Sequence, residues 1–228
     1  MARGETCHYP AGRKFLTLQV VRLLLTSLKI FLLVFFLRVI VQRFVPLPRY
    51  DGPELLPEAS RPAELLPEAD FWRLIEASRH HGLTSYNGQL STLSEELAGL
   101  DTLTLRRFDR TLAHLLRQSY DARLWQAAYA VNGGCSDDCF EYFRGWLMTQ
   151  GRDKFYWTLR HPRLLLLTGR SEFAQGYEGL EHVAAAQYWR KAGRRMPAAE
   201  SAPYQLKGPM FDERAALLRY PELWLLVW

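Results

Sequence analysis

The residues best suited to chemistry lie in one short stretch from Trp125 to Gly151, with the sequence WQAAYAVNGGCSDDCFEYFRGWLMTQG. Two adjacent carboxylates in it can hold a cation or exchange protons, and an arginine can hold an anion. The polar side chains fall within about three helical turns. They are predicted together as a candidate ligand-binding site: Asn132, Ser136, Asp137, Asp138, Glu141 and Arg144.

Helix capping explains the same residues without chemistry, and this interpretation is favoured. Asn132-Gly133-Gly134 predicts a turn that ends one helix, because glycine tolerates positive φ. Ser136 predicts the N-cap of the next helix, which places Asp137 and Asp138 in its first turn, where carboxylates interact favourably with the helix dipole. Adjacent side chains on a helix point about 100° apart. The two aspartates therefore do not converge on one metal ion.

No motif in the chain assigns a reaction, a cofactor or a metal. GxSxG, HExxH, Walker, GxGxxG and zinc-finger patterns are all missing from the sequence. The cysteines, Cys7, Cys135 and Cys139, make no CxxC pair and predict no disulfide framework. Cys135 and Cys139 are interpreted as small buried or cap-adjacent residues.

Charge is unevenly distributed along the 228 residues. Residues 1–49 contain eight Lys or Arg and one acidic residue, whereas the rest of the chain contains 21 basic and 23 acidic residues. Nucleic-acid binding requires many cations facing phosphates. The near-neutral remainder therefore predicts no nucleic-acid partner.

The N-terminal segment, residues 1–44, contains a long apolar stretch, LTLQVVRLLLTSLKIFLLVFFLRVIVQRF at 16–44. A single membrane helix over about 18–42 is the favoured prediction, because such a helix reaches across a bilayer. The alternative is a helix lying in the membrane interface, since Gln19, Arg22, Thr26 and Lys29 share one helical face. Basic residues flank both ends, so they do not set the orientation.

Residues 45–69, VPLPRYDGPELLPEASRPAELLPEA, predict a proline-rich linker. Proline removes backbone donors and favours extended polyproline II structure. The expected result is a spacer between the membrane segment and the domain.

Residues 70–228 predict a compact all-α domain. Helices are expected from about Asp70 to His81, Gln89 to Ala98, Asp101 onward, Asp121 onward, Ser136 to Gly151, Arg152 to Arg160 and Glu178 to Arg195. The third has apolar residues at helical spacing, including Leu105, Phe108 and Leu112, as a core-facing helix requires. Alternating β-branched runs, which indicate strands, are scarce. The role of the apolar end, Leu223 to Trp228, stays open.

Three blocks of the chain resemble one bacterial family. They are the WQAAYAVNGGCSDDCFEYFRGWL region, GLEHVAAAQYWRKAGRRMP, and FDERAALLRYPELW near the end. They are similar to the domain of unknown function 4240 (DUF4240), over about residues 69–225. The resemblance implies a fold and a lineage but no activity. Its relatives are mostly soluble, which favours a cytoplasmic side for the domain, whereas the N-terminal segment departs from the family pattern.

The functional expectation is a membrane-tethered helical domain that acts as a binding or scaffolding module. Its partners would be the membrane, through the N-terminal helix, and another protein. The alternative is a small-ligand binder or enzyme centred on the turn and acidic helix start between Asn132 and Asp138. Neither the ligand nor the oligomeric state follows from the sequence.

Overall fold

The computed structural model describes residues 20–21, 23–33, 36, 47–81, 85–168, 179–198 and 205–224. The chain divides into two units, Met1–Pro46 and Leu47–Trp228. In the first unit, the described residues are helical and expose their apolar side chains, such as Leu23 (68%) and Leu33 (69%). No helix in the described parts of the chain is both long enough and apolar enough to cross a membrane. Much of the predicted span over about 18–42 lies outside the described residues.

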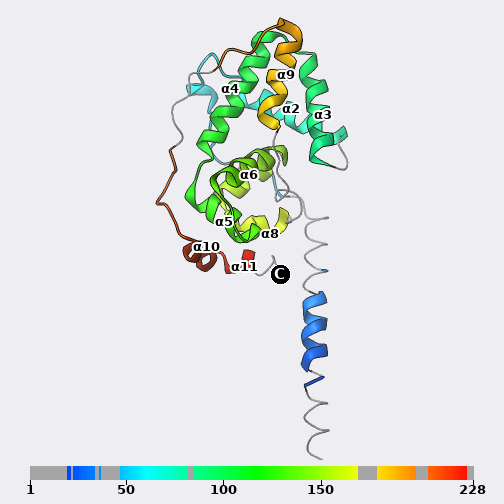
Figure 1. Cartoon of the computed structure of the whole chain (residues 1–228), viewed down its shortest axis with the longest axis vertical. Coiled ribbons are helices and arrows are strands. Elements are labelled where there is room, and N and C mark those ends of the chain that lie inside the picture. Colours follow the sequence, from blue (N-terminus) through cyan, green and yellow to red (C-terminus); the bar gives the residue numbers. More distant parts are fainter. Residues whose placement is uncertain are drawn as a thin grey trace, which may run out of the picture. The chain divides into compact units, whose positions relative to one another are not determined.

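The second unit is all-α, as the sequence predicts (Figure 1). Its described residues form no β-strand, and their only extended pairing is an isolated bridge between Asp121 and Lys207. The α-helices are α2 (Glu68–His81), α3 (Tyr86–Ala98), α4 (Thr102–Gln118), α5 (Ala122–Asn132), α6 (Asp137–Thr149), α7 (Arg152–Arg160), α8 (Leu165–Thr168), α9 (Leu180–Ala192), α10 (Glu213–Arg219) and α11 (Pro221–Trp224). The described residues also form two short 3-10 helices, η1 (Glu58–Ser60) and η2 (Pro162–Leu164).

Side-chain caps fix where the central helices begin. Asp101 accepts from the backbone N–H groups of Leu103 and Thr104, and Asp121 caps α5 in the same way. Ser136 accepts from the N–H of Cys139 at the start of α6. Each cap satisfies donors that the first helical turn leaves without partners. The N-cap predicted at Ser136 is therefore confirmed, and the helix starts expected near Asp101 and Asp121 match those of α4 and α5.

Helix α6 lies at the centre of the unit and contacts α2, α3, α4, α5 and α7 (Figure 1). Phe140, Phe143, Trp146 and Leu147 are almost fully buried on it. Around this helix, α4 packs against α9, α2 packs against α3, and α10 and α11 pack against α5. The stretch that carries the candidate site residues thus also carries the middle of the core.

The proline-rich residues differ from the predicted extended spacer. From Leu47 onward they belong to the same unit as the helices. Tyr50, Leu56, Leu65 and Leu66 are buried in its core. Polar contacts support this packing, because the Leu66 N–H donates to Thr111 Oγ1 at 2.8 Å. The reason is hydrophobic: each ELLPEA repeat provides two leucines, and their burial outweighs the extended preference of the flanking prolines.

The C-terminal residues add two helices that the periodicity did not indicate. Asp212 caps α10 by accepting from the N–H of Ala215 at 2.7 Å. Ala216, Tyr220 and Leu223 are buried, with exposed fractions of 0%, 4% and 0%. Part of the apolar end therefore docks on the core at Leu223, whereas residues 225–228 lie outside the described residues.

Candidate functional site

The α5–α6 turn has the local geometry that its glycines and serine predict. Gly133 ends α5 with φ 71°, in the left-handed region that favours glycine. The Asn132 side chain donates to the carbonyl of Gly134 at 2.9 Å. Trp125 Nε1 donates to the carbonyl of Cys135 at 3.0 Å. The turn is therefore held by contacts from within α5 as well as by the Ser136 cap.

Asp137 and Arg144 both contact Tyr120, which lies between α4 and α5. The Tyr120 hydroxyl donates to Asp137 Oδ1 at 2.8 Å. The Arg144 guanidinium lies over the Tyr120 ring, 4.8 Å from its centroid. Burial and the hydrogen bond with Asp137 raise the pKa of Tyr120 to about 12, against the opposing charge of Arg144. Tyr120 is thus a neutral donor to Asp137 at physiological pH.

Arg144 acts in the core rather than in an open site. Its side chain is 2% exposed, and its Nε donates to the carbonyl of Phe140 at 3.3 Å. A second donor, Nη1, reaches the carbonyl of Leu116 at 2.5 Å, near the C-terminus of α4. A cation there complements the negative end of the helix dipole.

The remaining predicted residues lie on the surface of the same helix start. Ser136, Asp138 and Glu141 are exposed, and Asn132 is half-buried. The structure thus brings together Asn132, Ser136, Asp137 and, through Tyr120, Arg144, whereas Asp138 and Glu141 face solvent. No group of three His, Cys, Asp or Glu side chains among the described residues is arranged to hold a metal ion.

One expectation at this turn is wrong, because Cys135 and Cys139 are joined by a disulfide. Their Cα atoms are 5.2 Å apart, at a sequence separation of four. The spacing did not indicate this pairing, because it matches neither a CxxC pair nor the long loops of a disulfide framework. The chain conformation at the helix start brings the two side chains together, because Cys135 directly precedes the N-cap Ser136 and Cys139 lies in the first turn of α6.

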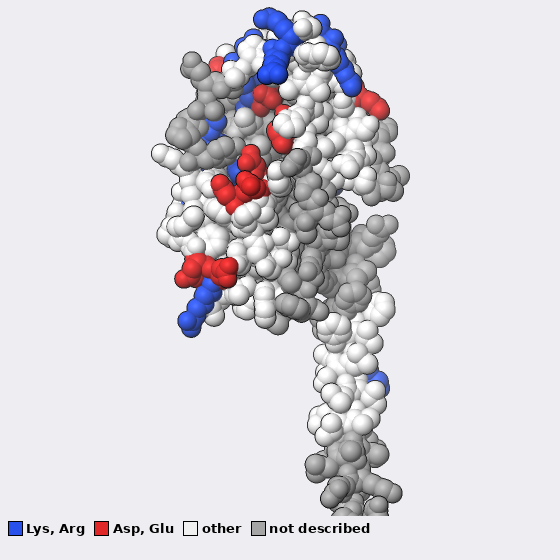
Figure 2. Space-filling view, in the orientation of Figure 1, with Lys and Arg blue, Asp and Glu red and all other residues white. Residues whose placement is uncertain are grey.

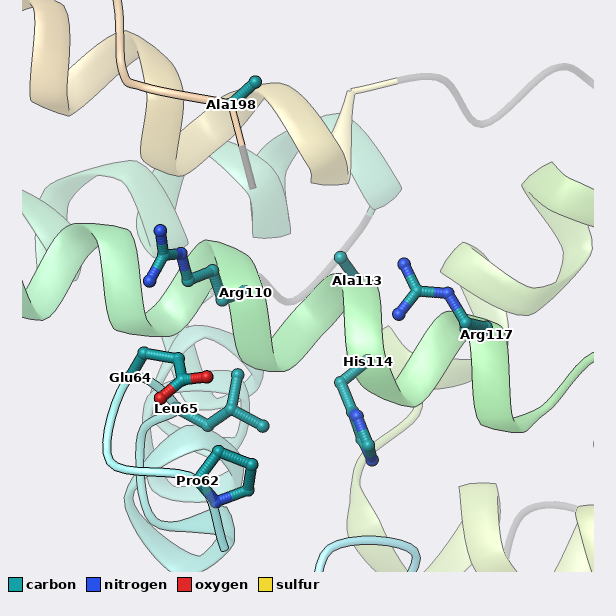
Figure 3. A pocket seen from close by; sticks show the side chains of 8 residues that line it. All are labelled: Pro62, Glu64, Leu65, Arg110, Ala113, His114, Arg117 and Ala198. Carbon is teal, nitrogen blue, oxygen red and sulfur yellow. The ribbon is translucent and has the colours of Figure 1, made fainter. Parts of the chain in front are cut away.

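A second polar region, which the sequence analysis missed, is a cleft along α4 (Figure 3). The cavity has a volume of about 540 Å³. From α4 it is lined by Arg110, Ala113, His114 and Arg117, as Figure 3 shows. The opposite walls are the segment before α2, with Pro62, Glu64 and Leu65, and Ala198 beyond α9. Two guanidinium groups thus share this α4 cleft with one carboxylate.

His114 adds a neutral acceptor to the α4 cleft. Its Nε2 is buried and has no hydrogen-bond partner. Burial lowers the pKa of His114, and the charges of Arg117 and Lys207 lower it further, whereas a hydrogen bond with the Leu55 backbone opposes them. A neutral imidazole can accept a proton or a hydrogen bond from an acidic ligand.

A spacing signal for this cleft was present in the sequence. Arg110, His114 and Arg117 are at i, i+4 and i+7, which places them on one helical face. The opposite wall gave no signal, because it comes from residues that were interpreted as a spacer and from a segment beyond the last predicted helix.

A smaller cavity of about 340 Å³ lies between Tyr50, Tyr156 and the Asp121–Lys207 bridge. Two of its cations already have partners. Arg123 pairs with Asp121, and Lys207 Nζ donates to the carbonyl of Gln118 at 2.7 Å. This cavity is also smaller than the α4 cleft.

Comparison with known proteins identifies a family over residues 66–190, described as a protein of unknown function (DUF4240). The chain belongs to this family. The DUF4240 match includes the α5–α6 turn and the α4 side of the cleft. It stops short of Pro62, Glu64 and Leu65 on one side and of Ala198 on the other. No curated protein and no solved structure matches the chain.

Proposed function

We propose that this DUF4240 protein is a binding module that holds an anionic ligand in the α4 cleft. The observation that carries the proposal is the lining of the cavity, where Arg110, Arg117 and the buried His114 Nε2 project from one helix. Guanidinium groups bind phosphate and carboxylate oxygens through several donors at once. The His114 imidazole, whose pKa is lowered by burial, can take up a proton from solvent when an anion binds beside it.

The charge around the α4 cleft also favours an anion. Arg106 and Arg107 lie on the same helix, and α9 ends in a basic run that precedes Ala198. Figure 2 shows basic side chains gathered where Figure 1 places the end of α9. Such a cluster raises the local concentration of anions.

Binding of inorganic pyrophosphate to the full chain tests this proposal. Pyrophosphate should raise the melting temperature of the wild type, and the increase should shrink as sodium chloride is added. Arg110→Gln should abolish the increase, whereas Arg117→Lys should reduce it, because lysine keeps the charge and loses the fork of donors.

The matched control is Arg73→Gln on the exposed face of α2, where the arginine side chain is 70% exposed and pairs with Asp70. This variant should keep the full pyrophosphate response. An unchanged response in Arg110→Gln, or no response in the wild type, would refute anion binding in the α4 cleft.

We also propose that the N-terminal unit attaches the module to a membrane, by crossing it or by lying in its interface. Support comes from the exposed apolar side chains between Val20 and Phe36, which include Phe31 at 62%. In an aqueous environment such a contiguous apolar surface marks an interaction site.

Flotation of the full chain with phospholipid vesicles tests membrane attachment. Leu28→Glu combined with Phe31→Glu should leave the protein at the bottom of the gradient. Met210→Glu combined with Leu218→Glu changes two apolar residues of the second unit that are more exposed, at 73% and 71%, than Leu28 and Phe31, at 53% and 62%, and should leave flotation intact. The proposal would be contradicted if both double variants lost flotation equally, or if the variant with Leu28→Glu and Phe31→Glu still floated.

A further inference from the structure

We propose that Cys135 and Cys139 form a reversible thiol–disulfide site that exchanges with small disulfides of neutral or positive charge, with Cys139 as the exchanging sulfur. The pair is joined in the structure, and the proposed anion binding in the α4 cleft does not use it. Three features support the proposal: backbone contacts that do not involve sulfur, unequal exposure of the two cysteines, and the carboxylates close in sequence.

The backbone around the pair is held without the sulfur–sulfur bond. The Cys139 N–H donates to Ser136 Oγ at 3.3 Å, and Trp125 Nε1 donates to the Cys135 carbonyl at 3.0 Å. The Gly134 N–H donates to the Tyr129 carbonyl at 3.0 Å. These contacts survive reduction, and the bond spans only four residues, so it constrains little of the unfolded chain. The dithiol form therefore keeps the same fold.

The two cysteines differ in their surroundings. Cys135 is buried, with 9% of its surface exposed, and belongs to the hydrophobic core. Cys139 is half-buried in the first turn of α6, and Asn132 Nδ2 approaches its Sγ at 3.7 Å. The helix dipole and the amide donor both stabilise a thiolate at Cys139, whereas burial disfavours one at Cys135.

Three carboxylates lie close in sequence to the more accessible sulfur. Asp137 and Asp138 precede Cys139 directly, Glu141 follows it by two residues, and all three are exposed. Figure 2 shows carboxylates gathered over the position that α6 occupies in Figure 1. They oppose ionisation of Cys139, so they partly cancel the helix dipole. They also repel an approaching anion and attract a cation. The exchange partner is therefore selected by charge.

The oxidation proceeds in two exchange steps. The Cys139 thiolate attacks one sulfur of a disulfide RSSR, a mixed disulfide Cys139–S–SR forms, and one RS⁻ leaves. Cys135 then loses its proton to solvent, its sulfur attacks Cys139 Sγ, and the second RS⁻ leaves. The two cysteines lose two electrons in total and RSSR gains them, which yields two RSH after protonation. Excess RSH drives the same steps in reverse.

The charge selection is tested on the full chain in detergent, with Cys7→Ser to remove the third thiol. The reduced protein is mixed at low ionic strength with cystamine, hydroxyethyl disulfide or dithiodiglycolate, which are cationic, neutral and anionic disulfides. Mass spectrometry after alkylation then follows the loss of both thiols. Cystamine should react about tenfold faster than dithiodiglycolate. Asp138→Asn combined with Glu141→Gln should bring the rates of cystamine and dithiodiglycolate closer together. Equal rates for these two disulfides in the protein that carries only Cys7→Ser would overturn the proposed selection by charge.

Variants of each cysteine test the order of attack. Cys135→Ser should accumulate the mixed disulfide at Cys139, whereas Cys139→Ser should leave Cys135 largely unmodified on the same timescale. The opposite pattern would overturn the assignment of Cys139. The helical circular dichroism signal should be the same in both redox states. A bond that is reduced only after denaturant is added, or a loss of helix on reduction, would make the disulfide a structural crosslink and refute reversibility.

Discussion

The hydroxyl of Tyr156 on α7 donates a hydrogen bond to the carboxylate of Glu68, 88 residues earlier in the chain. The other oxygen of Glu68 accepts from the Leu56 N–H at 3.0 Å, and Oε1 also accepts from Trp72 Nε1 at 2.7 Å. Glu68 is 2% exposed. One buried carboxylate therefore joins the proline-rich segment, α2 and α7.

Replacement of this carboxylate should weaken the attachment of the proline-rich segment. Glu68→Gln turns one acceptor into a donor that faces the donors of Leu56, Trp72 or Tyr156, so we expect a loss of about 1–3 kcal/mol in the free energy of unfolding. Limited proteolysis should then cut residues 47–67 first. Glu95→Gln, at an exposed position of α3, is the control. Unchanged stability in Glu68→Gln would show that the network contributes little.

Burial raises the pKa of Glu68, against the hydrogen bonds from Tyr156 and Trp72. A raised folded-state pKa means that the stability is fully present below the ordinary value of 4.5 and is lost as pH rises through the folded-state value. We expect the difference in unfolding free energy between wild type and Glu68→Gln to change over that window, as measured by urea denaturation at several pH values. A difference that stays constant with pH would contradict a buried, titrating carboxyl.

Replacement of Gly151 and of Gly145 by alanine should change the free energy of unfolding in opposite directions. Gly151 has φ 91°, and an added Cβ would collide with the side chains of Glu76 and Arg79. We expect Gly151→Ala to cost about 1–3 kcal/mol. Gly145 lies within α6, where a Cβ meets nothing within 4 Å, so alanine should stabilise by about 0.5–1 kcal/mol. Thermal unfolding of both variants checks the pair, and a shift of the same sign in both would refute this explanation.

The two aspartates at the start of α6 should contribute unequally to stability. Asp137 interacts with the helix dipole and accepts from Tyr120, so Asp137→Ala should cost about 1–2 kcal/mol. Asp138 is exposed and is expected to contribute through the helix dipole, so Asp138→Ala should lower the free energy of unfolding by about 0.3–1 kcal/mol. Chemical denaturation of the two variants measures the difference. An equal cost, or stabilisation by Asp137→Ala, would indicate that the Tyr120 contact serves another purpose.

Ligand binding in the α4 cleft should depend on pH through His114. Its pKa lies below the ordinary value of 6.5, so the neutral imidazole stabilises the fold above that value, and this contribution is lost as pH falls through the folded-state pKa. A bound anion favours the protonated form, so pyrophosphate should bind more tightly as pH falls over that window. Calorimetry in buffers of different ionisation enthalpy should detect proton uptake on binding. His114→Gln should remove this proton uptake. The charged groups around residue 114, which are Glu64, Arg110, Arg117 and Lys207, are unchanged in that variant.

Several helices were predictable from local chemistry, although α10, whose Asp212 cap is equally local, was not predicted. Asp101, Asp121 and Ser136 are caps, and their side chains contact backbone N–H groups two or three residues away, so a short window of sequence contains the whole interaction. The proline-rich segment was not predictable in this way. Its burial depends on Thr111 and Tyr156, which lie far along the chain, and no periodicity in residues 47–67 reveals them.

The candidate site shows the same division between local and distant contacts. The turn geometry and the Ser136 cap followed from the sequence, whereas the contacts of Arg144 with Leu116 and Tyr120 required the packing of α6 against α4. The α4 cleft joins three parts of the chain that no single motif connects. The helical spacing of Arg110, His114 and Arg117 could have indicated one wall of it but was not noticed, and the other walls follow only from the fold.

The packing of α10 and α11 on α5 has a practical consequence for work on the whole family. The family match ends at residue 190, but Ala216, Tyr220 and Leu223 are part of the buried interior. A recombinant fragment that contained only the matched residues would lose these side chains, together with Leu56 and Leu65 at the other end. The apolar core surface that they cover would then be exposed to solvent. Such a fragment would aggregate or capture unrelated proteins through that surface. Interaction screens on family members should therefore use a segment that includes at least residues 47–224.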